Sequence, residues 1–503
     1  MTLCLILGLA AFFRVYALGG RDLWTDEAWV ALAALKDSPQ AALAASQSTP
    51  PLYLLSVWAL AQVGGNGEAV LRSLSLFFGL GLLLLFWPLA RSLTSRAASL
   101  LALTLVGFSP IMVYYAKELK QYSGDAFFAA LIFLLVERLR QRESKWLWLA
   151  LGLAGTIGLG FSHALVFILP VAWVTLWVIL PSGPRLKVAL LGGVWAGAFA
   201  AFYFLFLRGQ VDPELIAYWA QDFPNFSSLT AFLWWLGTAF YRYFRYFFGE
   251  WGLFWGLPLI LAGIFALIRQ GCRRSCLYLG GPLLLALGAA TLHRYPFMAH
   301  YGGNRLMLFS APVLYLVAAV GLMAILTRLW GKRQRLLALA LTGLLLLAAN
   351  PLHVLRENLY PTNNREEIQP LVTYLQKRLK PRDWVYVYYF AVPPFKYYWH
   401  SPFKNVCWGK SCVEIEMMLP TAKGNRPTRL WLMAAHFPSL QHMRKFAGEL
   451  LGPQWRETAC LNRASAALFC FAWQGPQLAK SQTTLAKPDE SGPPTPTTDT
   501  AYR

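Results

Sequence analysis

Charged residues are scarce in this sequence of 503 residues. Asp, Glu, Lys and Arg together make up 14% of it, whereas a soluble globular chain carries about 25%. Hydrophobic residues make up 57%. This composition excludes an ordinary soluble enzyme and indicates an α-helical polytopic membrane protein.

Acidic residues are especially few, at 24 against 45 Lys and Arg, so the formal net charge is +21. In a soluble protein this excess would indicate nucleic-acid binding. Here the basic residues gather in five short loops between hydrophobic runs, at 91–96, 138–145, 185–187, 269–274 and 328–335. With the spans given next, all five loops fall on one face, which the positive-inside rule makes cytoplasmic. The excess charge is therefore an orientation signal, and the expected partner is a lipid bilayer and not a nucleic acid.

Hydrophobic runs long enough to cross a bilayer recur along the chain. We predict about eleven transmembrane helices, at 2–18, 71–90, 97–115, 125–136, 146–162, 164–180, 187–207, 251–268, 276–292, 306–326 and 335–350. An odd number places the amino terminus inside and the carboxyl terminus outside. A shorter apolar stretch at 52–63 is expected to form an interfacial helix on the outer side. The first segment has no basic n-region and no small-residue cleavage site, so no cleavable signal peptide is expected.

The polar carboxyl-terminal part predicts a separate extracytoplasmic α/β domain over residues 352–475, after a membrane domain over 1–351. Residues 366–379 have the apolar spacing of an amphipathic helix, and residues 383–389 are rich in Val and Tyr, as strands are. Residues 476–503 are rich in Pro, Thr, Ser and Lys and are expected to be disordered.

Four of the seven cysteines lie in this carboxyl-terminal domain. An oxidising compartment would allow the disulfides Cys407–Cys412 and Cys460–Cys470, although sequence does not settle the connectivity. Four free thiols are the alternative. A zinc site is weaker, because no Cys-x-x-Cys pair is present.

The sequence also lacks a P-loop, a zinc-protease motif and a nucleophile elbow. What it has instead is Asp26 and Glu27 between Trp24 and Trp29, directly after the first apolar segment and at the start of an outer loop over 19–70. Carboxylates at a membrane boundary are costly unless they have a partner or a task, such as accepting a proton from a hydroxyl or binding a cation. Equally, Thr25 or Asp26 could cap a short helix with Glu27 in its first turn.

Further polar residues gather on the same predicted face. Glu118 and Tyr122 are four residues apart and would share one helical face, with Lys120 turned aside; the alternative is a helix end with snorkelling lysines. His163 lies between two apolar runs, where a histidine is more often a hydrogen-bonded structural group than a base.

Three arginines complete the set of candidates. Arg242 and Arg245 lie among aromatic residues and could hold a lipid phosphate or serve as interface anchors. Arg305 follows a glycine pair that suits close approach to a phosphate. Together with the carboxylates, these residues suit transfer of a group from a phosphate-bearing lipid to a hydroxyl.

The pattern resembles the C-type membrane glycosyltransferases, in particular the branch of dolichyl-phosphate-mannose–protein mannosyltransferases and lipid A aminoarabinose transferases. The resembling segments lie within about residues 1–350 and are Leu23–Ala28, Pro50–Tyr53, Ser109–Pro110, Glu118–Tyr122, His163 and Tyr295–Arg305.

The resemblance implies a polyprenyl-phosphate sugar donor and an inverting direct displacement onto a hydroxyl of a lipid, glycan or protein acceptor. It makes Asp26 the catalytic base, with Glu27 supporting it, and implies an active site that faces the periplasm or exterior of a bacterial plasma membrane. The family commonly has Glu-x-Arg-x-Tyr where this chain has Lys120, which keeps the charge but loses the bidentate fork.

Two other classes of membrane protein stay open as alternatives. A transporter or flippase of lipid-linked sugars is disfavoured because no internal repeat is evident and most charges lie at segment ends. A glycan polymerase or ligase would be favoured by a diphosphate-linked oligosaccharide donor. No cofactor is required by the pattern. A divalent cation stays open because adjacent carboxylates can hold Mg²⁺, although this branch of the family generally does without one.

Overall fold

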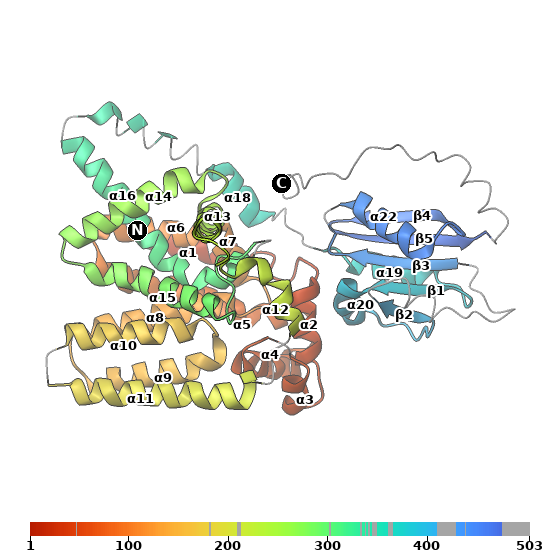
Figure 1. The fold of residues 1–503 in the computed structure, drawn as a ribbon, viewed down its shortest axis with the longest axis horizontal. Coiled ribbons are helices and arrows are strands. Elements are labelled where there is room, and N and C mark those ends of the chain that lie inside the picture. The colour runs from red at the N-terminus through yellow and green to blue at the C-terminus, as the bar shows by residue number, and fades with distance from the viewer. Residues whose placement is uncertain are drawn as a thin grey trace. The chain divides into compact units, whose positions relative to one another are not determined.

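The computed structural model describes most of the chain. The described residues are 1–46, 48–180, 183–208, 213–300, 303–331, 334–337, 339–340, 343–344, 350–360, 366–409, 429–437 and 439–474. They divide into two compact units (Figure 1). Unit 1 comprises residues 1–18 and 33–361, and unit 2 comprises residues 19–32 and 362–503. Residues 19–32, which the sequence places in an outer loop of the membrane domain, therefore group with the carboxyl-terminal domain.

Unit 1 is built from helices. In chain order they are α1 (Thr2–Val15), α3 (Pro39–Ala44), α4 (Pro51–Gly64), α5 (Glu68–Leu93), α6 (Arg96–Phe108), α7 (Pro110–Ala116), α8 (Tyr122–Gln141), α9 (Lys145–Phe161), α10 (Leu165–Ile179), α11 (Arg185–Phe202), η1 (Tyr203–Leu207), α12 (Pro213–Tyr218), η3 (Ala220–Asp222), α13 (Leu229–Phe248), α14 (Gly252–Arg269), α15 (Arg273–Thr291), η4 (Gly303–Ser310), α16 (Ala311–Gly331) and α18 (Pro351–Leu359).

Each predicted span from 2–18 to 306–326 coincides with one or two of these helices. By length and composition, four helices in the described part of the chain are sufficient to cross a membrane: Glu68–Leu93, Arg185–Leu207, Gly252–Arg269 and Gly303–Trp330. The pair α6 and α7, bent by 56°, would make a fifth. The apolar stretch at 52–63 is helix α4. Most of the predicted span 335–350 falls outside the described residues.

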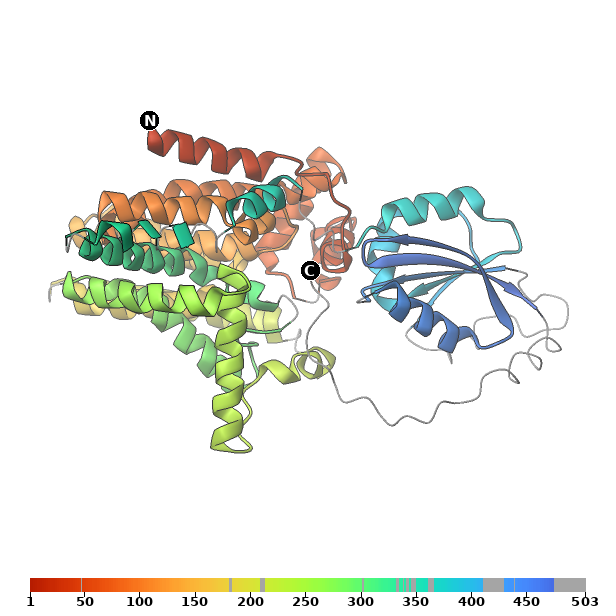
Figure 2. The same cartoon turned by 90° about the horizontal axis from the view of Figure 1, so that it is seen from above.

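Helix α13 was not predicted from the sequence. It runs across the direction of most other long helices of unit 1, being seen end-on in Figure 1 and along its length in Figure 2. Its sequence carries Arg242 and Arg245 among aromatic residues, so it lacks the uninterrupted apolar run by which spans are recognised. Trp234 and Leu229 on this helix are largely exposed, whereas Tyr243 and Phe247 are buried.

The break between α6 and α7 is stabilised by side chains from distant parts of unit 1. Pro110 has no N–H to continue the helix, so carbonyl groups before it lose their usual partners. Buried Arg14 donates to the carbonyl oxygens of Gly107 at 2.7 Å and of Val106 at 3.0 Å. Asn358 Nδ2 donates to the carbonyl oxygen of Phe108 at 3.0 Å. The carbonyl oxygens exposed by the bend therefore have hydrogen-bond partners, and the bend sets the path of the chain from α7 into α8.

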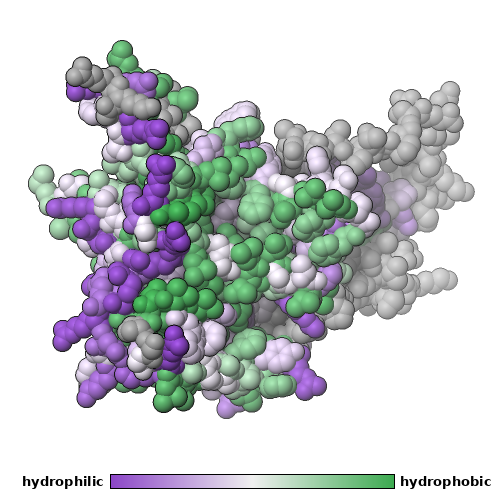
Figure 3. Space-filling view, turned by 60° about the vertical axis from the view of Figure 1, so that its left-hand side comes forward, coloured by the Kyte–Doolittle hydropathy of each residue, from purple (hydrophilic) through white to green (hydrophobic). Residues whose placement is uncertain are grey.

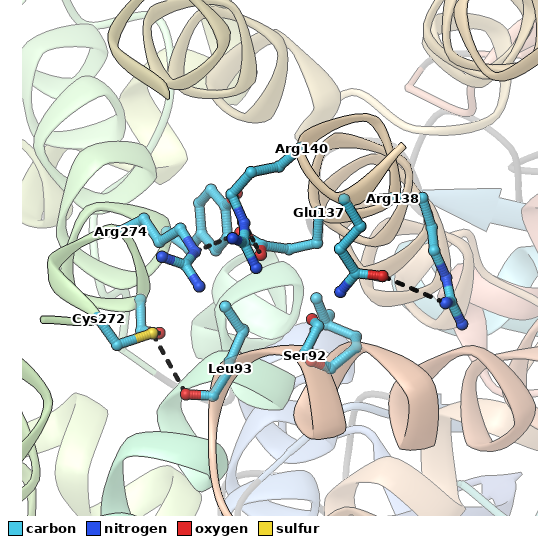
Figure 4. A network of polar contacts seen from close by, with 11 residues as sticks. Ser92, Leu93, Glu137, Arg138, Arg140, Cys272 and Arg274 are labelled. Atoms are coloured by element: carbon cyan, nitrogen blue, oxygen red, sulfur yellow. Dashed lines mark hydrogen bonds and ion pairs between the residues drawn. The ribbon is translucent and has the colours of Figure 1, made fainter. Parts of the chain in front are cut away.

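Loops predicted to be cytoplasmic meet around one buried carboxylate. Figure 4 shows Arg140 and Arg274 turned toward Glu137, whose oxygens accept at 3.0 and 2.7 Å. The hydroxyl of Tyr278 donates to the same carboxylate at 3.0 Å. Cys272 Sγ reaches the carbonyl oxygen of Leu93 at 3.2 Å (Figure 4).

A further contact joins another of these loops, since Lys187 Nζ lies 2.6 Å from Glu143. The basic segments near residues 91–96, 138–145, 185–187 and 269–274 thus lie at one end of the helical unit.

The outer surface of unit 1 is hydrophobic. In Figure 3, hydrophobic side chains cover broad areas of the visible face, while hydrophilic side chains gather along one side. Large exposed apolar side chains occur on many of the helices, among them Leu84, Leu149, Val178, Leu190, Phe204, Phe254, Leu261 and Leu284. Apolar exposure on this scale is typical of a surface that contacts lipid and not water.

Helices α14 and α16 approach each other closely at two glycines. A Cβ atom at Gly263 would collide with the carbonyl oxygen of Val317, and one at Gly321 with that of Leu259. Small residues at such positions allow backbones to pack closely where no hydrophobic effect drives helices together.

Unit 2 is an α/β domain to which residues 19–32 and most of helix α2 (Thr25–Ala34) belong. Its strands are β1 (Trp384–Tyr388), β2 (Val406–Gly409), β3 (Arg429–Ala435), β4 (Trp455–Arg463) and β5 (Ala466–Trp473), in the sheet order β2-β1-β3-β5-β4. β1 pairs in parallel with β2 and β3, and β5 pairs antiparallel with β3 and β4. Its other helices are α19 (Gln369–Arg378), η5 (Tyr389–Ala391), α20 (Val392–Tyr398) and α22 (Leu440–Leu451).

Both faces of this sheet are covered. α19 and α20 pack on the face that includes Val385 and Val387. α22 packs on the opposite face, which includes Tyr386. Neighbouring residues of β1 lie on opposite faces because successive side chains of a strand point to opposite sides of the sheet. The amphipathic helix and the strand predicted for this domain are confirmed as α19 and β1.

The predicted disulfide Cys460–Cys470 is wrong. Both cysteines are free, because Cys470 packs in the core beneath α19, whereas Cys460 lies against the core beneath α22. The register pairs Cys460 with Phe469 and Cys470 with Ala459, so the two thiols point to opposite faces of the sheet. Cys407 is also free, and burial raises the pKa of its thiol to about 11. Cys412 lies outside the described residues.

Candidate active site

The segment between α7 and α8 carries charged residues into the interior of unit 1. Lys117, Glu118 and Lys120 are all buried, with Glu118 completely so. Two hydrogen bonds anchor the segment: Ser75 Oγ donates to the carbonyl oxygen of Lys120 at 3.0 Å, and Lys117 Nζ donates to that of Tyr16 at 3.3 Å. Buried charges in a membrane protein are costly and mark functional sites.

The prediction that Glu118 and Tyr122 share one helical face is wrong. α8 begins at Tyr122, and residues 117–121 form bends and turns. The N–H of Lys120 donates to the carbonyl oxygen of Glu118, two residues earlier, at 2.8 Å, whereas the bonds of an α-helix span four residues. The chain changes direction here because α7 ends at Ala116 after the proline-induced bend.

Tyr122 and Arg305 meet, although 183 residues separate them. Arg305 Nε donates to the Tyr122 hydroxyl at 2.9 Å, and its guanidinium lies 5.7 Å from the centroid of the Tyr122 ring. Arg305 comes from η4, and Tyr122 is the first residue of α8. The structure thus brings together two of the residues that the sequence nominates for substrate binding. The planar guanidinium is suited to two-point recognition of a phosphate.

Aromatic side chains surround Tyr122. The Tyr115 ring meets that of Tyr122 edge-on, with centroids 5.2 Å apart. The Tyr246 hydroxyl donates to the Tyr115 hydroxyl at 2.9 Å. α13, which carries Tyr246, therefore also contributes to the surroundings of Tyr122.

Arg242 and Arg245, on the same helix, have carboxylate partners. Arg242 lies 3.5 Å from buried Asp222, and Arg245 lies 2.8 Å from exposed Glu250. His300 donates its backbone N–H to Asp222 at 3.0 Å and places Nδ1 2.6 Å from the other carboxylate oxygen. Asp222 thus joins α13 to the segment before η4. The role of the two arginines in phosphate binding stays a prediction.

His163 lies between α9 and α10 and is half-buried. Its Nε2 lies 3.2 Å from the carbonyl oxygen of Ser48. Burial lowers the pKa of His163 to about 4. At neutral pH the side chain is therefore uncharged and, as the tautomer with a proton on Nε2, donates to that carbonyl. This geometry describes a hydrogen-bonded structural group.

Asp26 and Glu27 lie in the first turn of α2, within unit 2. Asp26 is half-buried and Glu27 is buried. Carboxylates in a first turn interact favourably with the helix dipole, as the capping interpretation expects for Glu27. Thr25 does not act as the cap, because it is itself the first helical residue and its hydroxyl lies 2.8 Å from Glu366 and 2.5 Å from the carbonyl oxygen of Phe390.

Sequence reasoning missed two partners that the structure shows. The sequence does not single out Asp222, and it places Glu366 only at the start of an amphipathic helix. Glu366 lies 341 residues from Thr25 in the chain. No local period or spacing signals such a contact.

No group of three or more His, Cys, Asp or Glu side chains could hold a metal ion within the described ranges. The adjacent carboxylates Asp26 and Glu27 alone make too small a ligand set for Mg²⁺, which needs further oxygens from substrate or water.

Comparisons with known proteins match part of the chain by sequence and most of it by structure. Residues 48–207 match the model of the family described as dolichyl-phosphate-mannose-protein mannosyltransferase. The chain aligns with the crystal structure of ArnT from Cupriavidus metallidurans in the apo state with a TM-score of 0.53 and 14% sequence identity, over 93% of this chain and 97% of ArnT. The fold is that of ArnT, and the family match over residues 48–207 supports the likeness to the C-type membrane glycosyltransferases. The resemblance inferred from the sequence motifs is confirmed.

The oligosaccharyltransferase of Archaeoglobus fulgidus in its apo form is also similar to this chain, with a TM-score of 0.51 and 11% identity over 94% of this chain and 74% of that one. A second ArnT structure, bound to undecaprenyl phosphate, aligns with a TM-score of 0.49 and 13% identity over 93% of this chain and 97% of that one. No curated protein matches the chain in sequence.

Proposed function

We propose that this protein transfers a sugar from a polyprenyl-phosphate donor to a hydroxyl acceptor on the extracytoplasmic face of a bacterial plasma membrane. The observation that carries the proposal is the alignment with ArnT over nearly the full length of both chains. The donor class is supported by the family model over residues 48–207, whose description names a dolichyl-phosphate-linked sugar. The acceptor is a hydroxyl of a lipid, a glycan or a protein.

The proposed reaction is an inverting direct displacement. The acceptor oxygen forms a bond to the anomeric carbon while the bond from that carbon to the phosphate oxygen breaks. The acceptor proton passes to the carboxylate of Asp26, and the polyprenyl phosphate leaves as an anion. A positioned general base contributes about 10²–10⁴-fold to such a step. Glu27, which is buried beside Asp26 in the first turn of α2, supports it.

The leaving phosphate needs positive charge more than it needs a proton. Arg305 supplies this charge in the proposal, because its guanidinium is oriented by the hydroxyl and ring of Tyr122. Lys120 stands where the family commonly has an arginine and supplies a second cation from a buried position. Glu118, completely buried in the same segment, is proposed to orient these groups.

The orientation of the chain is part of the proposal. The contacts that join the basic loops around Glu137 support a single cytoplasmic end, by the positive-inside rule. The amino terminus is then inside, and the α/β domain outside.

A reconstituted transfer assay tests the proposal. Purified protein in lipid vesicles is supplied with a polyprenyl-phosphate sugar, and mass spectrometry follows both the free polyprenyl phosphate and the glycosylated acceptor. We expect equal amounts of the two products. Movement of intact donor across the bilayer without cleavage would identify a flippase, and turnover only with a diphosphate-linked oligosaccharide would identify a polymerase or ligase. Surface glycolipids and glycoproteins from cells with and without the gene would identify the acceptor.

A further inference from the structure

The loop that leads into α2 is fastened to the α/β domain by hydrogen bonds inside unit 2. The N–H of Leu23 donates to the Tyr398 hydroxyl at 2.7 Å. The N–H of Gln369 donates to the Asp22 carboxylate at 2.9 Å. The side chains of Leu23 and Trp24 are buried. Residues far apart in sequence thus hold the stretch that carries the proposed catalytic base.

Glu366 makes two further contacts with this stretch. Its Oε2 accepts the backbone N–H of Thr25 at 2.9 Å and lies 2.8 Å from the Thr25 hydroxyl. The first N–H groups of a helix have no partner within the helix. A carboxylate at this position satisfies one of them with a charge-assisted bond and interacts favourably with the positive end of the helix dipole. α2 is therefore capped by a side chain from another part of the chain.

Glu366 is itself held in place. It is buried, and its Oε1 lies 2.8 Å from Nδ1 of His436. The imidazole of His436 stacks on the Phe390 ring with centroids 4.9 Å apart, and its backbone N–H donates to the carbonyl oxygen of Ser465. The Phe390 carbonyl oxygen lies 2.5 Å from the Thr25 hydroxyl. These contacts link Thr25, Glu366, His436 and Phe390 in a ring, so the Glu366 side chain has little freedom to turn away from α2.

We infer that Glu366 is a positioning residue for the transfer reaction, and this inference rests on the proposed function of Asp26. Asp26 directly follows Thr25, so fixing the N–H and hydroxyl of Thr25 fixes the first turn of α2 and the direction of the Asp26 carboxylate. Glu366 touches neither substrate nor reacting atom in this account. The α/β domain thereby becomes a part of the catalytic apparatus, and its task is to hold the base.

Three variants of the full-length protein test the inference in the reconstituted transfer assay. Glu366→Ala removes the cap. Glu366→Gln keeps an acceptor oxygen for the Thr25 N–H and should partly rescue. Asp383→Asn is the matched control, because Asp383 is a buried carboxylate of the same domain that bonds Arg429 and Trp431.

We expect Glu366→Ala to lower kcat about 10- to 100-fold, since small misplacements of a catalytic group have effects of this size. The donor KM should change less than threefold, because the donor phosphate is bound elsewhere in the proposal. Glu366→Gln should fall between wild type and Glu366→Ala, and Asp383→Asn should keep the wild-type kcat. Trypsin should cleave after Arg21 faster in Glu366→Ala than in wild type.

An unchanged kcat and an unchanged cleavage rate at Arg21 in Glu366→Ala would overturn the inference. An equal loss of kcat in Asp383→Asn would also overturn it, because the effect would then be general destabilisation. If Glu366→Ala does not fold, Thr25→Val decides, with a threefold or greater loss of kcat expected and an unchanged kcat contradicting. Full transfer by Asp26→Asn would instead refute the proposed function, whatever Glu366 variants do.

Discussion

Replacing Arg305 by glutamine should weaken transition-state stabilisation by a predictable amount. In the structure Arg305 is half-buried and is aimed by a 2.9 Å bond from its Nε to the Tyr122 hydroxyl. A hydrogen bond to a charged group contributes about 1.5–3 kcal/mol. Loss of this interaction with the departing phosphate therefore predicts a fall in kcat/KM of about 10- to 100-fold, because 1.4 kcal/mol corresponds to a factor of ten.

Tyr122→Phe provides a graded comparison. It removes only the hydroxyl that orients Arg305 and leaves the guanidinium in place, so kcat/KM should fall less than in Arg305→Gln, by about 2- to 10-fold. Arg305→Lys should be intermediate, because lysine keeps the charge but cannot present the planar fork. In the double variant the effects of Arg305→Gln and Tyr122→Phe should not add.

Transfer from a polyprenyl-phosphate sugar at varied donor concentration gives these values. A kcat/KM for Arg305→Gln within twofold of wild type would refute the phosphate-binding role. Strict additivity of the two substitutions would show that Tyr122 does not act through Arg305.

Three further predictions concern stability and the cysteines. Asp383→Asn should lower the free energy of unfolding by about 2–3 kcal/mol. This is less than for a fully buried ion pair, because the Arg429 side chain is 29% exposed. Alkylation of buried Cys470 during heating would follow the unfolding, and the same alkylation profile as in wild type would contradict a stabilising ion pair. Burial lowers the pKa of His163 to about 4, so between pH 6.5 and 4 the unfolded chain binds more protons than the folded one. The free energy of unfolding should therefore fall as the pH falls through that window. His163→Gln should remove part of this loss, and an equal loss in wild type and variant would contradict the prediction. Cys460 and Cys470 should both be alkylated in denatured protein without reductant, and a peptide in which they are disulfide-linked would disprove the observed register.

Periodicity and hydropathy predicted much of the fold. The apolar runs correspond to helices of unit 1, and the residue patterns of 366–379 and 383–389 correspond to α19 and β1. These features depend on residues close in sequence, where burial of one face imposes a pattern. α13 escaped prediction because its arginines interrupt an apolar run and its direction differs from that of the other long helices.

The sequence nominated several residues of the candidate site but did not predict the contacts between them. Arg305 and Tyr122 were both nominated, yet their bond joins η4 to the start of α8 and depends on how the helices pack. Glu366 was not nominated, because its contact with Thr25 joins segments 341 residues apart and forms only in the folded unit 2. The Glu118–Tyr122 spacing misled, because residues 117–121 form bends and turns and helix α8 begins only at Tyr122.

In the proposed reaction, Asp26 accepts the proton of the acceptor hydroxyl. The most direct measurement is the rate of sugar transfer by Asp26→Asn in reconstituted vesicles, with Asp37→Asn, an exposed acidic residue nearby in sequence, as the matched control. If Asp26 is the general base, Asp26→Asn should lose about 10²–10⁴-fold in kcat with donor binding retained, and Asp37→Asn should lose none. Full transfer activity in Asp26→Asn would contradict it.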